Sequence, residues 1–92
     1  MIRYHYATEE LDVEEKENGQ DREFLFHFKI PGQYVHDFQK VRAHFDRDRV
    51  ITDVFFYPQA DQRCRVIVRN DYYIDFVLAL FKYQIFSRIE WI

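Results

Sequence analysis

Residues 23–30 carry an apolar aromatic side chain at almost every second position, and this alternation constrains the fold more than any other feature of the sequence. In an extended strand, alternate residues point to opposite faces, so one face here is strongly apolar and the other is mixed. The apolar face holds Phe24, Phe26, Phe28 and Ile30, and the mixed face holds Leu25, His27 and Lys29. Burying lysine and histidine in place of three phenylalanines is unfavourable, so we expect the phenylalanines to face inward, toward helices.

The segments that follow alternate between helix and strand patterns. Pro31-Gly32 should end the phenylalanine strand, because proline cannot donate to the sheet. An amphipathic stripe predicts a helix over residues 33–45, and β-rich runs predict strands over residues 50–57 and 63–69, joined by a loop over 58–62. A second helix over about residues 72–85, capped by Asn70-Asp71, and a short strand over 87–92 complete the chain.

The resulting order of elements is strand, helix, strand, strand, helix, strand. This order resembles the ferredoxin-like split βαβ plan (β-α-β-β-α-β), an α+β fold in which an antiparallel sheet carries two helices on one face. In that plan the strands at 23–30 and 63–69 are central. We therefore expect a ferredoxin-like α+β domain over residues 23–92. The resemblance is one of topology and identifies no particular family, so it transfers no functional residue.

The first 22 residues differ in charge from the rest of the chain. Residues 8–23 hold eight acidic and two basic side chains, whereas the whole chain has a net charge of −3. Ile2, Tyr4 and Tyr6 alternate as in a short strand, and Asn18-Gly19 is typical of a two-residue hairpin turn. We predict an acidic N-terminal strand or hairpin extension over residues 1–22. It would be solvated, add to the sheet, or fold across the arginine-bearing face and neutralise it.

No residue pattern predicts catalysis. Cys64 lies between Arg63 and Arg65, whose charges could activate a thiol, but strand parity places Cys64 on the inward face with Val66 and Val68. The four histidines lack the spacing that sets two imidazoles on one helix face, and neither a glycine-rich phosphate loop nor a nucleophile elbow is present. The prediction is therefore a chain that is not an enzyme, with no cofactor and no metal site.

The single cysteine and the hydropathy pattern bear on the cellular compartment expected for the protein. One cysteine cannot form an internal disulfide, and the longest apolar run, residues 76–81, is far too short to span a membrane. The first ten residues contain no apolar stretch of the kind found in secretory signals. We expect a cytoplasmic protein with no membrane contact.

The outward side of the strands at 50–57 and 63–69 predicts a contact surface. It combines apolar side chains with arginines, as the centres of protein interfaces do, and the strand at 50–57 would be an edge open to pairing. The predicted anchors are Phe55, Tyr57 and Ile67, and the predicted rim is Arg63, Arg65 and Arg69. The expected function is a small non-enzymatic interaction or accessory domain that forms a homodimer or binds another protein.

Two other functions remain open at this point. The same arginines with His27 and Lys29 would make the outer sheet face basic, which predicts single-stranded nucleic-acid binding, RNA above all. Base stacking by the phenylalanines would require them to be exposed. Sensing of a small molecule at a dimer interface is a further alternative, based on analogy between folds alone.

Overall fold

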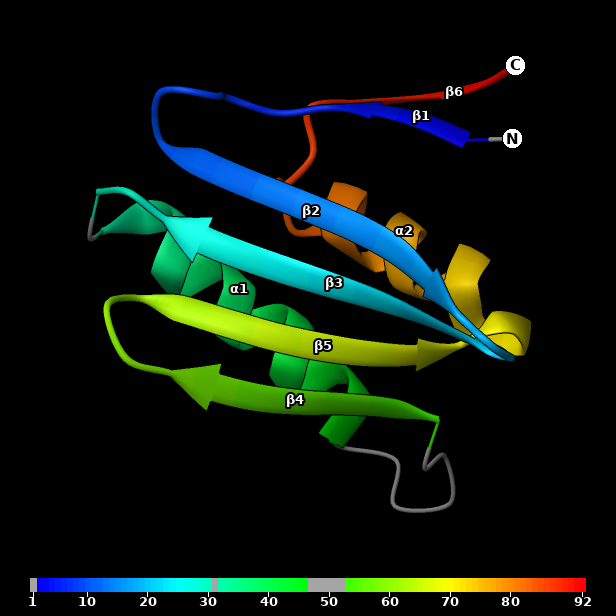
Figure 1. Ribbon diagram of the computed structural model, residues 1–92. Coiled ribbons are helices and arrows are strands. Elements are labelled where there is room, and N and C mark those ends of the chain that lie inside the picture. Colours follow the sequence, from blue (N-terminus) through cyan, green and yellow to red (C-terminus); the bar gives the residue numbers. More distant parts are fainter. Residues whose placement is uncertain (1, 31, 47–52) are drawn as a thin grey trace.

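Two helices cover one face of a four-stranded antiparallel sheet in the computed structural model, which describes residues 2–30, 32–46 and 53–92 (Figure 1). The strands lie in the order β2 (Leu11–Asn18), β3 (Asp21–Phe28), β5 (Arg63–Arg69) and β4 (Val54–Gln59). The helices α1 (Gln33–Asp46) and α2 (Tyr73–Lys82) lie behind the sheet. Neither described helix is long and apolar enough to cross a membrane.

The phenylalanines of β3 face the helices, which confirms the predicted orientation of this strand. Phe24 and Phe26 have no exposed surface and Phe28 is buried. The ring centroid of Phe26 lies 4.9 Å from that of Phe38 on α1, and the centroid of Phe24 lies 5.1 Å from that of Phe76 on α2. Such offset aromatic pairs add to the free energy gained from burial, so β3 joins both helices to one core.

The strand order differs from the ferredoxin-like plan at one edge. In that plan the last strand of the chain would pair with β3, but here β2 holds that position. The last strand, β6 (Arg88–Trp91), pairs instead with β1 (Ile2–His5) in a separate two-stranded sheet. The ferredoxin-like prediction is therefore wrong in strand order, although the α+β class, the two helices on one face and the central strands β3 and β5 are confirmed.

The hairpin between β2 and β3 explains why β2 occupies this edge. Asn18 pairs with Asp21, so the turn residues are Gly19 and Gln20, one position later than predicted. Gly19 has φ +65°, a conformation that glycine adopts without strain. Closing a two-residue turn costs less chain entropy than bringing the distant residues 88–91 to the same edge. The boundary predicted between residues 22 and 23 thus falls inside β3.

The remaining differences concern where elements begin and end. β4 includes Pro58, which was predicted to stop it and which an edge strand tolerates; residues 50–52 of the predicted strand lie outside the described residues. β3 ends at Phe28, which leaves Ile30 exposed beyond it. A short 3₁₀ helix, η1 (Asn70–Tyr72), stands in place of the predicted Asn70-Asp71 cap, and neither η1 nor α2 has a side-chain cap.

The second helix ends three residues before its predicted end. Gln84 adopts φ +66°, the left-handed conformation that commonly follows a helix. The backbone amide of Ile85 then donates to the carbonyl of Leu80 at 2.8 Å. Ile85 and Phe86 are both buried, so the apolar residues that extended the predicted helix reach the core from this turn.

Candidate interaction surface

The face of the sheet opposite the helices, here called the outer face, presents side chains in rows set by the strand register. Residues directly opposite each other in antiparallel strands point to the same face. Three rows cross all four strands. They are Asp12, His27, Arg63 and Gln59; Glu14, Leu25, Arg65 and Tyr57; and Lys16, Glu23, Ile67 and Phe55.

All six residues predicted for the interface belong to this outer face. Phe55 is 37% exposed and Tyr57 is 48% exposed, and both lie on β4 at the end of the strand order. Ile67 lies directly opposite Phe55 and is partly buried. Arg65 lies opposite Tyr57, and Arg63 and Arg69 stand at the two ends of β5. The three predicted anchors are thus contiguous across two strands.

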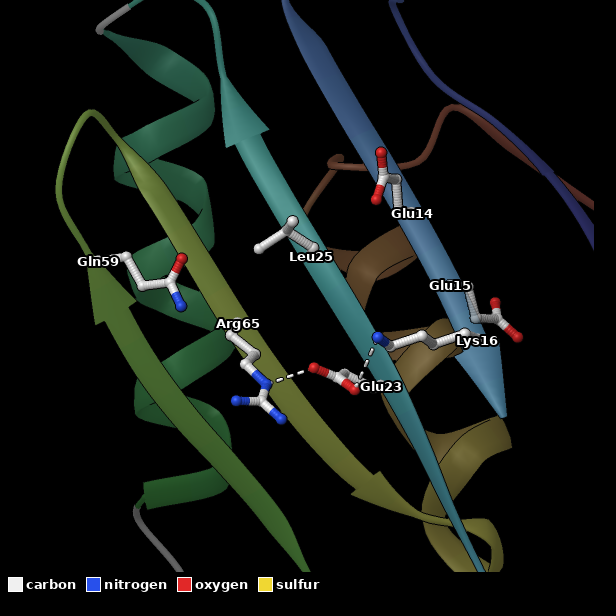
Figure 2. Close-up of a pocket in the computed structure, with 7 residues that line it drawn as sticks. All are labelled: Glu14, Glu15, Lys16, Glu23, Leu25, Gln59 and Arg65. Atoms are coloured by element: carbon white, nitrogen blue, oxygen red, sulfur yellow. Dashed lines mark ion pairs between the residues drawn. The ribbon is translucent and has the colours of Figure 1, made fainter. Parts of the chain in front are cut away.

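A shallow hollow of about 450 Å³ lies beside these anchors, and Figure 2 shows two basic side chains converging on Glu23 inside it. Glu23 is only 9% exposed although it belongs to the outer face. Arg65 places its Nε against Glu23 Oε1, and Lys16 Nζ lies 3.6 Å from Glu23 Oε2. Leu25 lies between the side chains of Gln59 and Glu14 (Figure 2). A carboxylate this buried needs paired charges, so Glu23 holds Arg65 in place.

The outer face is balanced in charge, contrary to the prediction that it is basic. Within the four strands it carries four basic side chains and four acidic ones. The basic set is Lys16, Arg63, Arg65 and Arg69, and the acidic set is Asp12, Glu14, Asp21 and Glu23. All four acids come from the β2–β3 hairpin, and three of them lie in residues 1–22, so the N-terminal segment neutralises the arginines by extending the sheet. A phosphate-binding surface needs excess positive charge, and this balance gives the nucleic-acid alternative no added support.

The inward side of β2 holds the carboxylate of Glu15, which belongs to the acidic run at residues 8–23. Tyr4 Oη donates to Glu15 Oε1 at 2.8 Å, and Tyr73 Oη donates to the same oxygen at 3.1 Å. Arg22 Nη1 donates to Glu15 Oε2 at 2.8 Å, and the Arg22 guanidinium lies 4.8 Å from the centre of the Tyr73 ring. Glu15 therefore ties together β1, β2, β3 and α2. Its alternation with Leu11 and Val13 is the sequence signal that could have placed it inward.

This cluster affects the two tyrosines that donate to Glu15. Burial first, and then the negative charge of Glu15, raise the pKa of Tyr73 to about 12. Burial and the hydrogen bond to Glu15 also raise the pKa of Tyr4 far above its ordinary value. Both phenols thus stay protonated and remain hydrogen-bond donors well above neutral pH.

The two edges of the four-stranded sheet differ in what lies beside them. Along β2, the Tyr6 hydroxyl donates to the backbone carbonyl of Val13 at 3.3 Å, and Tyr4 reaches Glu15. β1 and β6 run next to this edge (Figure 1). By contrast, β4 pairs only with β5 among the described residues. The backbone of β4 is therefore the edge available to another strand.

Cys64 lies on the inward face of β5, as strand parity predicts. It is 6% exposed, and burial raises the pKa of its thiol. Within residues 2–30, 32–46 and 53–92, no group of three or more histidine, cysteine, aspartate or glutamate side chains is placed to hold a metal ion.

The chain was compared with protein-family models, with curated proteins and with solved structures. None of the three comparisons found a match.

Proposed function

We propose that this protein is a small non-enzymatic interaction module that self-associates through β4. Two copies would pair their β4 strands antiparallel about a twofold axis and so join their sheets into one. The observation that carries this proposal is that β4 is an edge strand with two exposed aromatic side chains, Phe55 and Tyr57, next to Ile67. Edge strands with apolar side chains readily pair with another chain.

An antiparallel edge is complementary to itself, which favours a second copy as the occupant. A twofold axis through β4 presents the same strand to its own copy, and each unpaired amide then finds a carbonyl. The exposed rings of Phe55 and Tyr57 from the two copies would lie side by side on the joined outer face. Cross-strand aromatic pairs contribute roughly 0.2–1 kcal/mol each beyond the backbone hydrogen bonds. Pro58 has no amide to donate, so we expect the pairing to centre on residues 54–57.

The charges of the outer face are compatible with this pairing. Arg65 is already neutralised by Glu23, and Arg69 Nε lies 3.2 Å from Asp53 Oδ1. Arg65 and Arg69 therefore meet a second copy as paired charges, which limits charge repulsion at the β4 edge. Arg63, Arg65 and Arg69 would form the charged rim around the aromatic centre.

The test replaces an exposed anchor by a charge. Phe55→Asp should raise the dissociation constant of the β4 interface at least 100-fold, because it puts a carboxylate at the centre of the pairing, where it would be desolvated. Sedimentation equilibrium measures this effect as a lower mass at equal protein concentration. The variant should keep its thermal unfolding midpoint as a monomeric unit, since Phe55 is not part of the core.

Ala43→Asp is the matched control, because it adds the same charge at an exposed position of α1, on the opposite side of the sheet from the outer face. It should leave the mass unchanged. A Phe55→Asp variant that keeps the wild-type mass at every concentration would contradict the proposal. The proposal would also be contradicted if substitution of neither Phe55 nor Tyr57 changed the mass of the wild-type protein.

A further inference from the structure

The helix α2 carries an apolar stripe on the side that faces away from the core. Ile74, Leu78 and Phe81 are spaced at i, i+4 and i+7, and they are 37%, 52% and 47% exposed. The opposite side of α2 already supplies the core, where Phe76, Val77 and Leu80 have no exposed surface. Exposed positions with this spacing are normally polar in a helix that packs on one side only. The stripe therefore needs its own explanation.

The two ends of this stripe differ in shape and in charge. At the N-terminal end, Ile74 borders an open hollow of about 720 Å³, which is also lined by Tyr73, Trp91 and Ile2. At the C-terminal end, the Phe81 side chain is exposed. The charged residues of α2 are Asp75 in its first turn and Lys82 in its last turn.

We propose that the stripe is a second docking surface and that its occupant is another copy of α2, packed antiparallel about a twofold axis near Leu78. This arrangement places Phe81 of each copy at the hollow beside Ile74 of the other. The distance along the helix between these two residues is roughly 10 Å, so both ends engage at once. The same axis brings Asp75 of each copy near Lys82 of the other, which gives two symmetric ion pairs.

The apolar area that the α2 stripe can bury sets the expected affinity of the contact. Three half-exposed side chains offer roughly 300 Å² per copy, whereas a standard interface buries about 800 Å² per partner. The hollow with Trp91, which is 69% exposed, supplies part of the difference. We expect a dissociation constant in the micromolar range, weak enough for one charge to abolish the contact. α2 lies behind β2 and β3, away from the β4 edge, so one copy can use both surfaces (Figure 1).

The test measures self-association of the full chain in the Phe55→Asp background, where the β4 interface is removed. This variant should still form dimers through α2. Adding Leu78→Asp should raise the dissociation constant at least tenfold and leave monomers. Adding Asp75→Lys alone, or Lys82→Asp alone, should weaken the dimer as well, because each places like charges opposite each other.

Combining Asp75→Lys with Lys82→Asp should restore the dimer, since the two charges again oppose each other across the axis. A partner other than a second copy would not be recovered by this exchange. Thermal unfolding of each variant checks that the helix remains folded after its charges are reversed. Ala43→Asp on α1 again serves as the control and should leave the dissociation constant unchanged.

Different results would overturn the β4 proposal and the α2 proposal. If Leu78→Asp alone yields monomers while Phe55→Asp leaves the mass unchanged, α2 is the interface and the β4 proposal is wrong. A Phe55→Asp chain that is monomeric at every concentration would overturn the α2 proposal. In that background, a dimer that survives the added Leu78→Asp change, or that the double charge exchange does not restore, would also overturn it.

Discussion

The two edges of the four-stranded sheet are held by different kinds of contact. At the β2 edge, polar side chains from three other elements converge on Glu15: Tyr4 from β1, Arg22 from β3 and Tyr73 from α2. The β4 edge has no such contacts among the described residues. In the described part of the chain, β4 is held by its ladder to β5 and by inward apolar side chains, Phe56 above all, whose ring centroid lies 5.9 Å from that of Phe38.

This difference shows how one sheet can have a closed edge and an open one. A buried carboxylate with several donors fixes the positions of the segments that supply them, so it leaves little freedom for another strand to enter. Apolar anchoring from one side only holds β4 in the sheet but leaves its backbone available. Polar contacts hold the β2 edge and apolar contacts hold the β4 edge. Each of the following substitutions removes one of these contacts.

The largest expected effect is the loss of Glu15. Glu15→Ala leaves two tyrosine hydroxyls and a part-buried guanidinium without their acceptor, and should lower the free energy of unfolding by about 3 kcal/mol. The neighbouring Glu14→Ala is the matched control, because Glu14 is exposed on the outer face. It should change the free energy of unfolding by less than about 0.5 kcal/mol. Urea denaturation measures both values, and equal effects would contradict a specific role for Glu15.

A smaller effect is expected for the apolar anchor of the other edge. Phe56→Ala removes ring contacts with Phe38, Phe45 and Phe76 and should cost about 2 kcal/mol, less than a fully buried phenylalanine because Phe56 is only partly buried. Phe55→Ala on the outward side of the same strand should cost under about 1 kcal/mol in dilute monomeric protein. If Phe55→Ala proved the more damaging change at such dilution, β4 would not be anchored from the inward side alone.

The residues of the inward face could be predicted from the sequence, because burial of one face gives each strand or helix its own periodic pattern of apolar residues. Phe24, Phe26 and Phe28 repeat every second residue, and Phe38, Val41 and Phe45 follow helical spacing. For the same reason the buried position of Cys64 follows from parity. These signals are local, and they hold whichever strands become neighbours.

The pairing at the β2 edge could not be predicted in the same way. Either β2 or β6 could have paired with the side of β3 that β5 leaves open. No local pattern in residues 88–91 indicates that they pair with β1. The same limit applies to the site. The register of the β2–β3 hairpin places Lys16 opposite Glu23, but an acidic run read by composition alone hides both this pair and the inward Glu15. The alternation of Leu11, Val13 and Glu15 indicates that Glu15 points inward, but no local pattern identifies Tyr4 and Tyr73 as its partners.

The smallest expected effect concerns pH and again separates the two edges. The pKa of Tyr73 is raised from 10 in the unfolded chain to about 12 in the folded protein, so its contribution to stability is complete below pH 10. It is lost as the pH rises from 10 to 12, because a phenolate would face the Glu15 carboxylate. We expect a loss of about 1 kcal/mol from Tyr73, since this residue is only part-buried and solvent screens the repulsion.

Denaturation of the wild type and of Tyr73→Phe between pH 9 and pH 12 measures this contribution. The variant should be less stable at pH 9, because the hydrogen bond to Glu15 is gone, and it should lose less stability than the wild type as the pH rises. Parallel curves would mean that Tyr73 does not titrate against Glu15. Since Tyr4 donates to the same carboxylate oxygen, adding Tyr4→Phe should flatten the dependence further, and the closed edge should then respond to alkaline pH only through groups outside the Glu15 cluster.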